Sequence, residues 1–131
     1  MKEALSVPNL GDSTPYGYVQ GILANDFVFV AGQVGVDENY RPVGTDVQSQ
    51  ANKTFDNIIE VLAVAGLDLS DIVTMTVFLT DLRSDFSGFI EVRKTYFDGI
   101  DLPTSAVIGI SALALPELKV EIQAIAARRK P

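Results

Sequence analysis

The sequence contains neither cysteine nor histidine. Without cysteine, the chain has no disulfide, no thiolate nucleophile and no zinc–sulfur site. Without histidine, it has no Ser–His or Cys–His catalytic pair and no histidine-based metal site, and it lacks the side chain best suited to proton transfer at neutral pH. Any catalysis must therefore use carboxylates, Tyr, Ser, Lys, backbone groups or an ordered water.

Long apolar stretches and concentrated positive charge are also missing. No segment approaches the roughly 18 apolar residues of a membrane span, and residues 1–4 do not begin a secretory signal, so we expect a cytoplasmic protein with no membrane partner. The net charge is −7, and the only basic cluster is residues 128–130, which we interpret as a solvated chain end. Because phosphate neutralisation dominates nucleic-acid affinity, we expect no nucleic-acid partner.

The 131 residues suit one domain, and no repeat, low-complexity tract or linker divides them, so we predict a single domain over residues 1–131. Residues 1–15 are interpreted as an irregular lead-in. Hydrophobic periodicity predicts the other elements, which are strands at 18–22, 26–31, 71–80, 104–111 and 118–127 and helices at 45–66 and from about 84 to 99. This order predicts an α+β fold, in which two helices cover one face of a mostly antiparallel sheet.

The first predicted helix carries a signal at each end. Thr45 and Gln48 fit a capping box, and Gly66 is suited to the position just after the last turn. In the strand at 71–80, the period-two pattern predicts that Val73 lies on the same face as the other buried residues, which are Met75, Val77 and Leu79.

The sheet face opposite the helices is predicted to be apolar. It carries Phe78, Val107 or Ile108, and Ile125. A bare apolar face of this kind is normally covered in an oligomer, so the sequence predicts association.

Several segments resemble, in order and spacing, the Rid (YjgF) family of enamine/imine deaminases. The matching segments are residues 18–21 (Tyr-Val-Gln-Gly), 29–34 (Phe-Val-Ala-Gly-Gln-Val), 50–58, 71–81, 102–103 (Leu-Pro) and 120–126 (Val-Glu-Ile-Gln-Ala-Ile-Ala). The resemblance implies a chorismate-mutase-like fold and a homotrimer with a small-molecule cleft at each subunit interface, and we expect no cofactor and no metal. It also implies hydrolysis of reactive enamines or imines to a carbonyl compound and ammonia.

The resemblance assigns site residues one by one, and three of them depart from the family pattern. Tyr18 and Gly32 match residues that line the cleft and orient the substrate. Ser105 stands where the family has a carboxylate-binding arginine, Gln123 where we place its water-positioning glutamate, and Ile90 where it often has an asparagine. Without the bidentate guanidinium, a substrate carboxylate loses roughly 2–5 kcal/mol of interaction, which predicts that a 2-imino acid is a poor substrate.

Four of these residues also have an interpretation that involves no ligand. Tyr18 packs on the core, or it contacts the ligand. Gly32 ends a strand with positive φ, or it serves the site. Ser105 is an inert small residue rather than a nucleophile, because no base is available to activate it. Gln123 bridges a subunit interface, or it binds a water.

Two charged residues near these positions have open roles. Arg93 in the second helix either leans into the cleft and replaces the missing arginine, or forms a surface or interface salt bridge, for example with Glu91 or Asp85. Glu121 pairs with Lys119 or a neighbouring chain, or it acts in catalysis.

The sequence therefore leaves three functional hypotheses. The first is a diverged hydrolytic deaminase of a small enamine, imine or related carbonyl compound. The second is a trimer that binds a small ligand without catalysis. The third is the ribonuclease or translation-inhibitor role sometimes attached to the family, against which the negative charge and the missing histidine argue.

Overall fold

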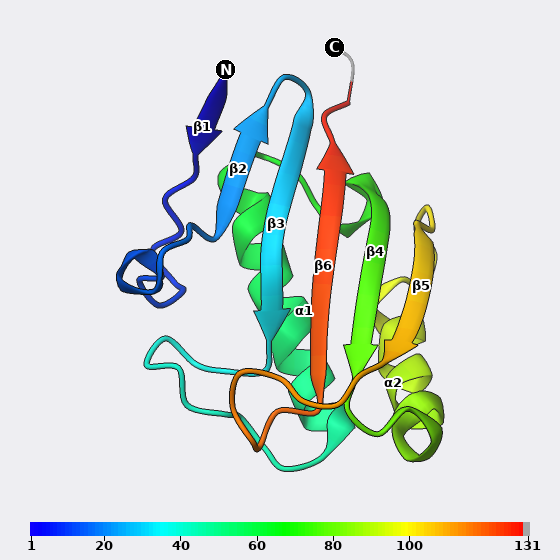
Figure 1. The fold of residues 1–131 in the computed structure, drawn as a ribbon. Coiled ribbons are helices and arrows are strands. Elements are labelled where there is room, and N and C mark those ends of the chain that lie inside the picture. Colours follow the sequence, from blue (N-terminus) through cyan, green and yellow to red (C-terminus); the bar gives the residue numbers. More distant parts are fainter. Residues whose placement is uncertain (130–131) are drawn as a thin grey trace.

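The computed structural model describes residues 1–129, which form a six-stranded sheet with both α-helices on one face (Figure 1). The elements are β1 (Lys2–Ala4), β2 (Gly21–Ala24), β3 (Phe27–Val34), α1 (Val47–Val64), β4 (Ile72–Leu79), α2 (Leu82–Tyr96), β5 (Thr104–Gly109) and β6 (Val120–Ala127), with short 3-10 turns at Thr14–Tyr16 and Leu69–Asp71. The strand order is β1-β2-β3-β6-β4-β5, and only the β4–β5 pair is parallel. The predicted α+β class is confirmed.

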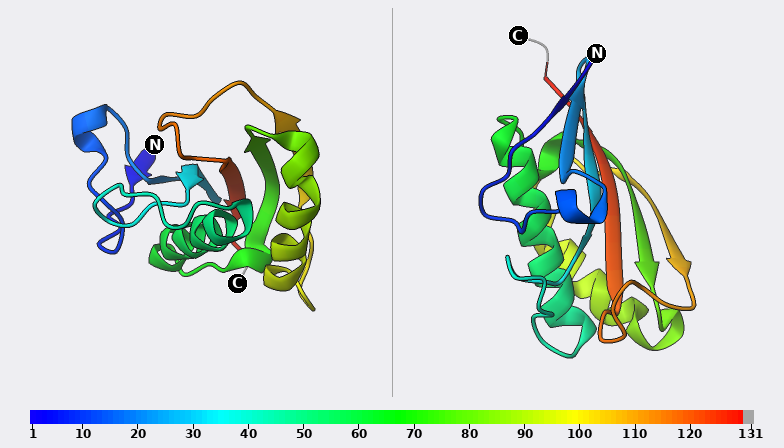
Figure 2. Two further views of the ribbon diagram at one scale, coloured as in Figure 1. Left: turned by 90° about the horizontal axis from the view of Figure 1, so that it is seen from below. Right: turned by 60° about the vertical axis from the view of Figure 1, so that its left-hand side comes forward.

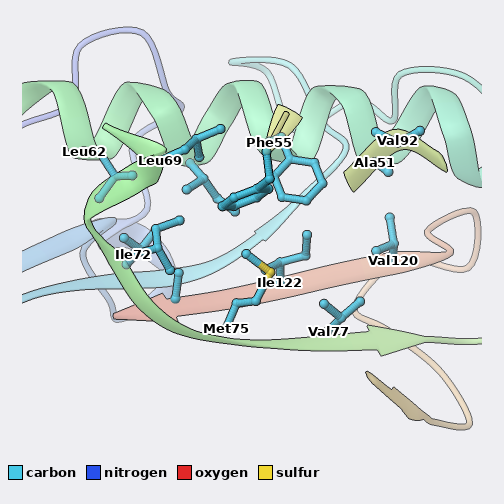
Figure 3. Packing of buried hydrophobic residues seen from close by; sticks show 14 of the residues in the cluster. Ala51, Phe55, Leu62, Leu69, Ile72, Met75, Val77, Val92, Val120 and Ile122 are labelled. Atoms are coloured by element: carbon cyan, nitrogen blue, oxygen red, sulfur yellow. The ribbon is translucent and has the colours of Figure 1, made fainter. Parts of the chain in front are cut away.

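The helix layer packs against one sheet face, as the side view shows (Figure 2). Phe55 of α1 is fully buried and lies over Met75 of β4 and Ile122 of β6 (Figure 3). Its ring stacks with the ring of Phe89 from α2 at 6.1 Å between centroids. This contact fixes α2 beside α1, so the residues of α2 are held at one edge of the sheet.

The ends of α1 follow from local sequence, with one correction. The cap is Asp46 rather than Thr45: its carboxylate accepts a hydrogen bond from the Ser49 amide at 2.7 Å. Asp46 has an extended backbone and a shorter reach to the third amide of the helix, so it takes the role predicted for its neighbour. Gly66 adopts φ +75° after the last turn, which confirms the predicted stop.

Two strands contain irregularities that a strict period of two does not predict. The strand register shifts between Ile72 and Thr74, so Val73 is 46% exposed and Ile72 is buried instead. The placement of Val73 on the core face was therefore wrong. A second shift between Val30 and Gln33 lets β3 continue through Gly32, which was predicted to end the strand. Gly32 does not adopt positive φ, so that explanation for the glycine is also wrong.

Other boundaries move by a few residues. The lead-in contains β1, which pairs with β2, and the strand predicted at 18–22 begins at Gly21. Helix α2 begins at Leu82, earlier than predicted, after Asp81. The basic tail is not wholly solvated, because Arg129 pairs with Asp71 at 2.7 Å. Lys130 lies outside the described residues.

The face opposite the helices is apolar, as predicted. Phe27, Phe29 and Ile108 are 45%, 44% and 43% exposed, and Ile108 is the register partner of Phe78 on β4. Val107 points to the other face and packs against the core. Within residues 1–129, neither helix combines the length and apolar character needed to cross a bilayer.

Candidate active site

The residues singled out from the sequence fall into two groups at different places on the sheet. We call Tyr18, Gly32 and Glu121 the Glu121 cluster, and Phe89, Arg93 and Ser105 the Arg93 cluster. The first lies at β3 and β6, and the second at β5 and α2. Strand β4 separates Glu121 on β6 from Ser105 on β5, a span of about 10 Å at the usual strand spacing, and the two side chains point to opposite faces of the sheet. One chain therefore does not bring the two clusters together.

In the Glu121 cluster, a carboxylate lies directly against a glycine. A Cβ atom at Gly32 would come within 2.5 Å of Oε2 of Glu121, so any other residue at position 32 would displace the carboxylate. Gly32 sits within the register shift of β3, where the irregular backbone gives the side chain this room. Only glycine fits beside Glu121 in this arrangement.

The Glu121 carboxylate is half-buried and has no partner within residues 1–129. It forms no hydrogen bond there, and Lys119, its expected partner, lies 4.0 Å from Asp85 instead. Loss of solvent through burial raises the pKa of the Glu121 carboxyl above its ordinary value. A carboxylate with a raised pKa is a stronger base than an exposed one, which suits it to accept a proton from water.

A polar network holds the glycine segment in place. Gln33 is buried, and its side-chain Nε2 donates to the side-chain Oε1 of Gln20 at 2.8 Å. Gln20 in turn donates to the Gly11 carbonyl at 3.2 Å. These bonds tie β3 to the lead-in, so Tyr18 and Gly32 line one narrow pocket of about 20 Å³. Tyr18 is exposed there, which excludes the interpretation that it packs in the core.

Gln123 lies elsewhere on the bare sheet face. It is exposed, and its register partner is Thr76 on β4. It lines a shallow hollow of about 320 Å³ that is largely apolar and includes Phe29 and Ile125. Gln123 is two residues from Glu121 on the same face, about 7 Å along the strand. Glu121, rather than Gln123, is the residue that lies against Gly32.

The Arg93 cluster forms on the helix-covered side of β5. Ser105 pairs in register with buried Met75, so its side chain points to the same face. Nη1 of Arg93 donates to Ser105 Oγ at 2.7 Å and lies 4.0 Å from Met75 Sδ. The guanidinium carbon lies 5.1 Å from the centre of the Phe89 ring. The structure thus brings Arg93 of α2 and Ser105 of β5 together from two different elements.

Arg93 has no carboxylate partner among the described residues. The salt bridges there join Lys119 to Asp85 and Arg129 to Asp68 and Asp71, so the alternative pairing of Arg93 with Glu91 or Asp85 is not formed. Desolvation lowers the pKa of the Arg93 guanidinium.

Ile90 has no polar role in this arrangement, because it packs against the hydrophobic core. The part of the chain that the structure describes holds no group of three or more acidic residues able to bind a metal ion.

A family model described as "Endoribonuclease L-PSP" matches residues 13–128. The chain belongs to the Rid (YjgF) family. Among curated Rid relatives, TdcF of Escherichia coli K12 is 39% identical over 85% of this chain and 86% of its own length. The 2-iminobutanoate/2-iminopropanoate deaminase of Salmonella typhimurium is 35% identical over 86% and 88%.

Solved Rid structures superpose closely on this chain. Yeast Mmf1 covers 98% of this chain and 100% of its own, with a TM-score of 0.90 and 27% identity. Escherichia coli TdcF with bound serine covers 97% and 99%, with a TM-score of 0.86 and 35% identity. The fold therefore spans nearly the whole chain in this Rid protein and in its relatives.

Sequence reasoning on this Rid protein left the roles of Glu121 and Arg93 open. Glu121 was expected to pair with Lys119 or a neighbouring chain, or to act in catalysis, and within residues 1–129 the pairing with Lys119 is not formed. No sequence signal separates Glu121 from Gln123, because both lie on the same face of β6 and the register shift that brings Gly32 against Glu121 is defined only by the paired strands. Arg93 gave a better signal, since its helical phase already allowed contact with the cleft.

Proposed function

We propose that this Rid protein hydrolyses a small reactive enamine or imine to a carbonyl compound and ammonia. In the imine form of the reaction, water adds to the C=N carbon, and the nitrogen leaves as ammonia while C=O forms. The observation that carries the proposal is the unpaired, desolvated Glu121 carboxylate against Gly32. The name of the Salmonella relative, a 2-iminobutanoate/2-iminopropanoate deaminase, supports the same reaction class.

In this proposal Glu121 acts as the general base. Its carboxylate accepts a proton from the attacking water and returns it to the departing nitrogen, a role that needs no histidine. Gly32 provides the space for that carboxylate, and Tyr18 lines a small pocket that Gly32 also borders. Glu121 thus takes the water-positioning role that the motif comparison gave to Gln123.

We further propose that the site is completed between subunits of a homotrimer. In one chain β4 lies between Glu121 on β6 and Ser105 on β5, and the two side chains point to opposite faces of the sheet, so one small substrate reaches both clusters only if they come from neighbouring copies. The exposed Phe27, Phe29 and Ile108 supply apolar surface for such contacts. The expected mass in solution, by light scattering, is three times the chain mass of 14.1 kDa.

The test is ammonia release from 2-iminobutanoate that an amino-acid oxidase generates in the assay, measured above the rate in buffer. Glu121→Gln should lower the catalysed rate by about 10²- to 10⁴-fold, because it removes the base. Gln123→Ala is the matched control from the same strand face and should retain most of the activity. A wild type that releases no ammonia above the buffer rate would leave the ligand-binding trimer as the better hypothesis.

The description of the matched family model names an endoribonuclease, which makes RNA cleavage the competing activity. The charge of −7 disfavours a polyanion, and the exposed face is apolar rather than basic. We expect no binding of labelled RNA in a titration at low salt. Saturable binding that weakens as salt is added would contradict this expectation.

A further inference from the structure

A guanidinium occupies the neighbourhood of position 105, although residue 105 itself is a serine. Arg93 reaches this place from α2, and its Nη1 donates to Ser105 Oγ at 2.7 Å. The Rid resemblance places an arginine on the strand at this position. The charged group is therefore still present within one hydrogen bond of the expected place, but it arrives from the helix.

The surroundings of Arg93 favour an anion that the chain itself does not supply. One face of the guanidinium lies near the Phe89 ring at 5.1 Å, and Met75 Sδ is 4.0 Å from Nη1. No carboxylate lies within 4.0 Å of it in residues 1–129. A guanidinium has five N–H donors. Among residues 1–129, Ser105 and Met75 are the only side chains that accept a hydrogen bond from the Arg93 guanidinium. Several donors of a partly desolvated cation are thus left for a ligand.

The space beside Arg93 suits a short acid. A hollow of about 200 Å³ is lined by Arg93, Lys94, Phe97, Leu102, Pro103 and Ser105. The Arg93 guanidinium can hold a carboxylate, while the apolar side chains of the hollow can contact a short alkyl group. Ser105 accepts from Arg93 and still has its own proton to donate.

We propose that Arg93, positioned by Ser105, binds the carboxylate of the substrate, which is therefore a short 2-imino acid. The identification of the substrate as an imine rests on the proposed deaminase function. Binding of a carboxylate by Arg93 can be measured without catalysis, so it is tested separately. Carboxylate binding by Arg93 reverses the expectation that a 2-imino acid is a poor substrate, because that expectation assumed that no guanidinium was present. Arg93 is the substrate-binding residue, and Ser105 is a positioning residue.

The test measures binding of 2-oxobutanoate, the product of 2-iminobutanoate hydrolysis, by calorimetry or ligand-observed NMR. The neutral ketone 2-butanone serves as the comparison ligand. Arg93→Gln should weaken binding of 2-oxobutanoate by about 10- to 100-fold, the usual loss of a hydrogen bond to a charged group. It should leave the weak binding of 2-butanone unchanged. Arg93→Lys should give an intermediate loss, because an ammonium keeps the charge without the bidentate geometry.

Two further variants separate ligand binding from structural effects. Arg83→Gln removes the same charge from an exposed position of the same helix and should change nothing. The double variant Arg93→Tyr with Ser105→Arg moves the guanidinium to the strand and should restore carboxylate binding to within a few-fold of wild type.

Each outcome decides the proposal. The proposal is overturned if Arg93→Gln binds 2-oxobutanoate as tightly as the wild type does. If that variant also has a different mass in solution, Arg93 belongs to a subunit contact instead. Arg93-dependent binding without ammonia release would keep this inference and reject the deaminase. Ammonia release that is unaffected by Arg93→Gln would support the deaminase and reject the role of Arg93 in substrate binding.

Discussion

The Glu121 cluster and the Arg93 cluster bring their charged groups into place in different ways. At the Glu121 cluster, the acid and the glycine stay within their sequence motifs, and a shift in strand register brings them into contact. At the Arg93 cluster, the motif position has become Ser105, and the cation comes from a different element. A strand motif alone therefore does not locate the cation beside Ser105, because a site depends on where atoms lie rather than on which residue carries them.

The strongest way to sharpen this comparison is to crowd the Glu121 cluster. Gly32→Ala places a methyl group where the Glu121 carboxylate lies, so ammonia release should fall by about 100-fold, the effect expected of a misplacement near 1 Å. Adding Glu121→Asp shortens the acid and should recover part of the loss. Thermal unfolding of each variant checks that the fold survives, and an active Gly32→Ala protein would contradict the assigned contact.

A pH profile tests whether the two clusters differ in titration. Burial raises the pKa of Glu121, and the base acts only when deprotonated, so activity should fall by up to tenfold per unit as the pH drops through that raised pKa. The decline should begin at a higher pH than the ordinary glutamate value of about 4.3 suggests. Arg93 stays charged throughout this range, so affinity for 2-oxobutanoate should change much less. If activity and affinity for 2-oxobutanoate changed with pH in the same way, Glu121 and Arg93 would not have separate roles.

Ser105→Ala probes the weaker partner of the Arg93 cluster. It removes one hydrogen bond that orients Arg93 while the cation remains, so the KM for the imine should rise by about 3- to 10-fold with little change in kcat. Thr104→Ala, on the neighbouring exposed position of β5, is the matched control. A loss in kcat as large as that of Glu121→Gln would instead give Ser105 a direct part in the chemistry.

The smallest expected effect concerns stability. A raised pKa means that the folded protein binds the Glu121 proton more tightly than the unfolded chain does. The charged carboxylate therefore lowers stability above that pKa, and the penalty disappears as the pH falls through it. Glu121→Gln should raise the unfolding temperature by about 1–3 °C at pH 7 and by less at pH 4. Arg93→Gln should not show this pH dependence, which scanning calorimetry at the two pH values would check.

Most of the fold was predictable, because its signals are local. The apolar spacing of α1 and the glycine at position 66 set that helix to within two residues at each end. The apolar residues that alternate along β6, including Val120, Ile122 and Ala124, are buried in the core. The errors occurred where a strand departs from a period of two, at Val73 and at Gly32. An extra residue in one strand has no signature in that strand alone, since it is defined against the partner strand.

The sequence by itself determined the α+β layers, the bare apolar face and the absence of histidine and cysteine chemistry, because periodicity and composition are properties of the chain before it folds. The tertiary structure decided that Glu121 lies against Gly32 and that Arg93 reaches Ser105. Both contacts join residues on separate elements, and their geometry depends on strand register and on how α2 packs against the sheet.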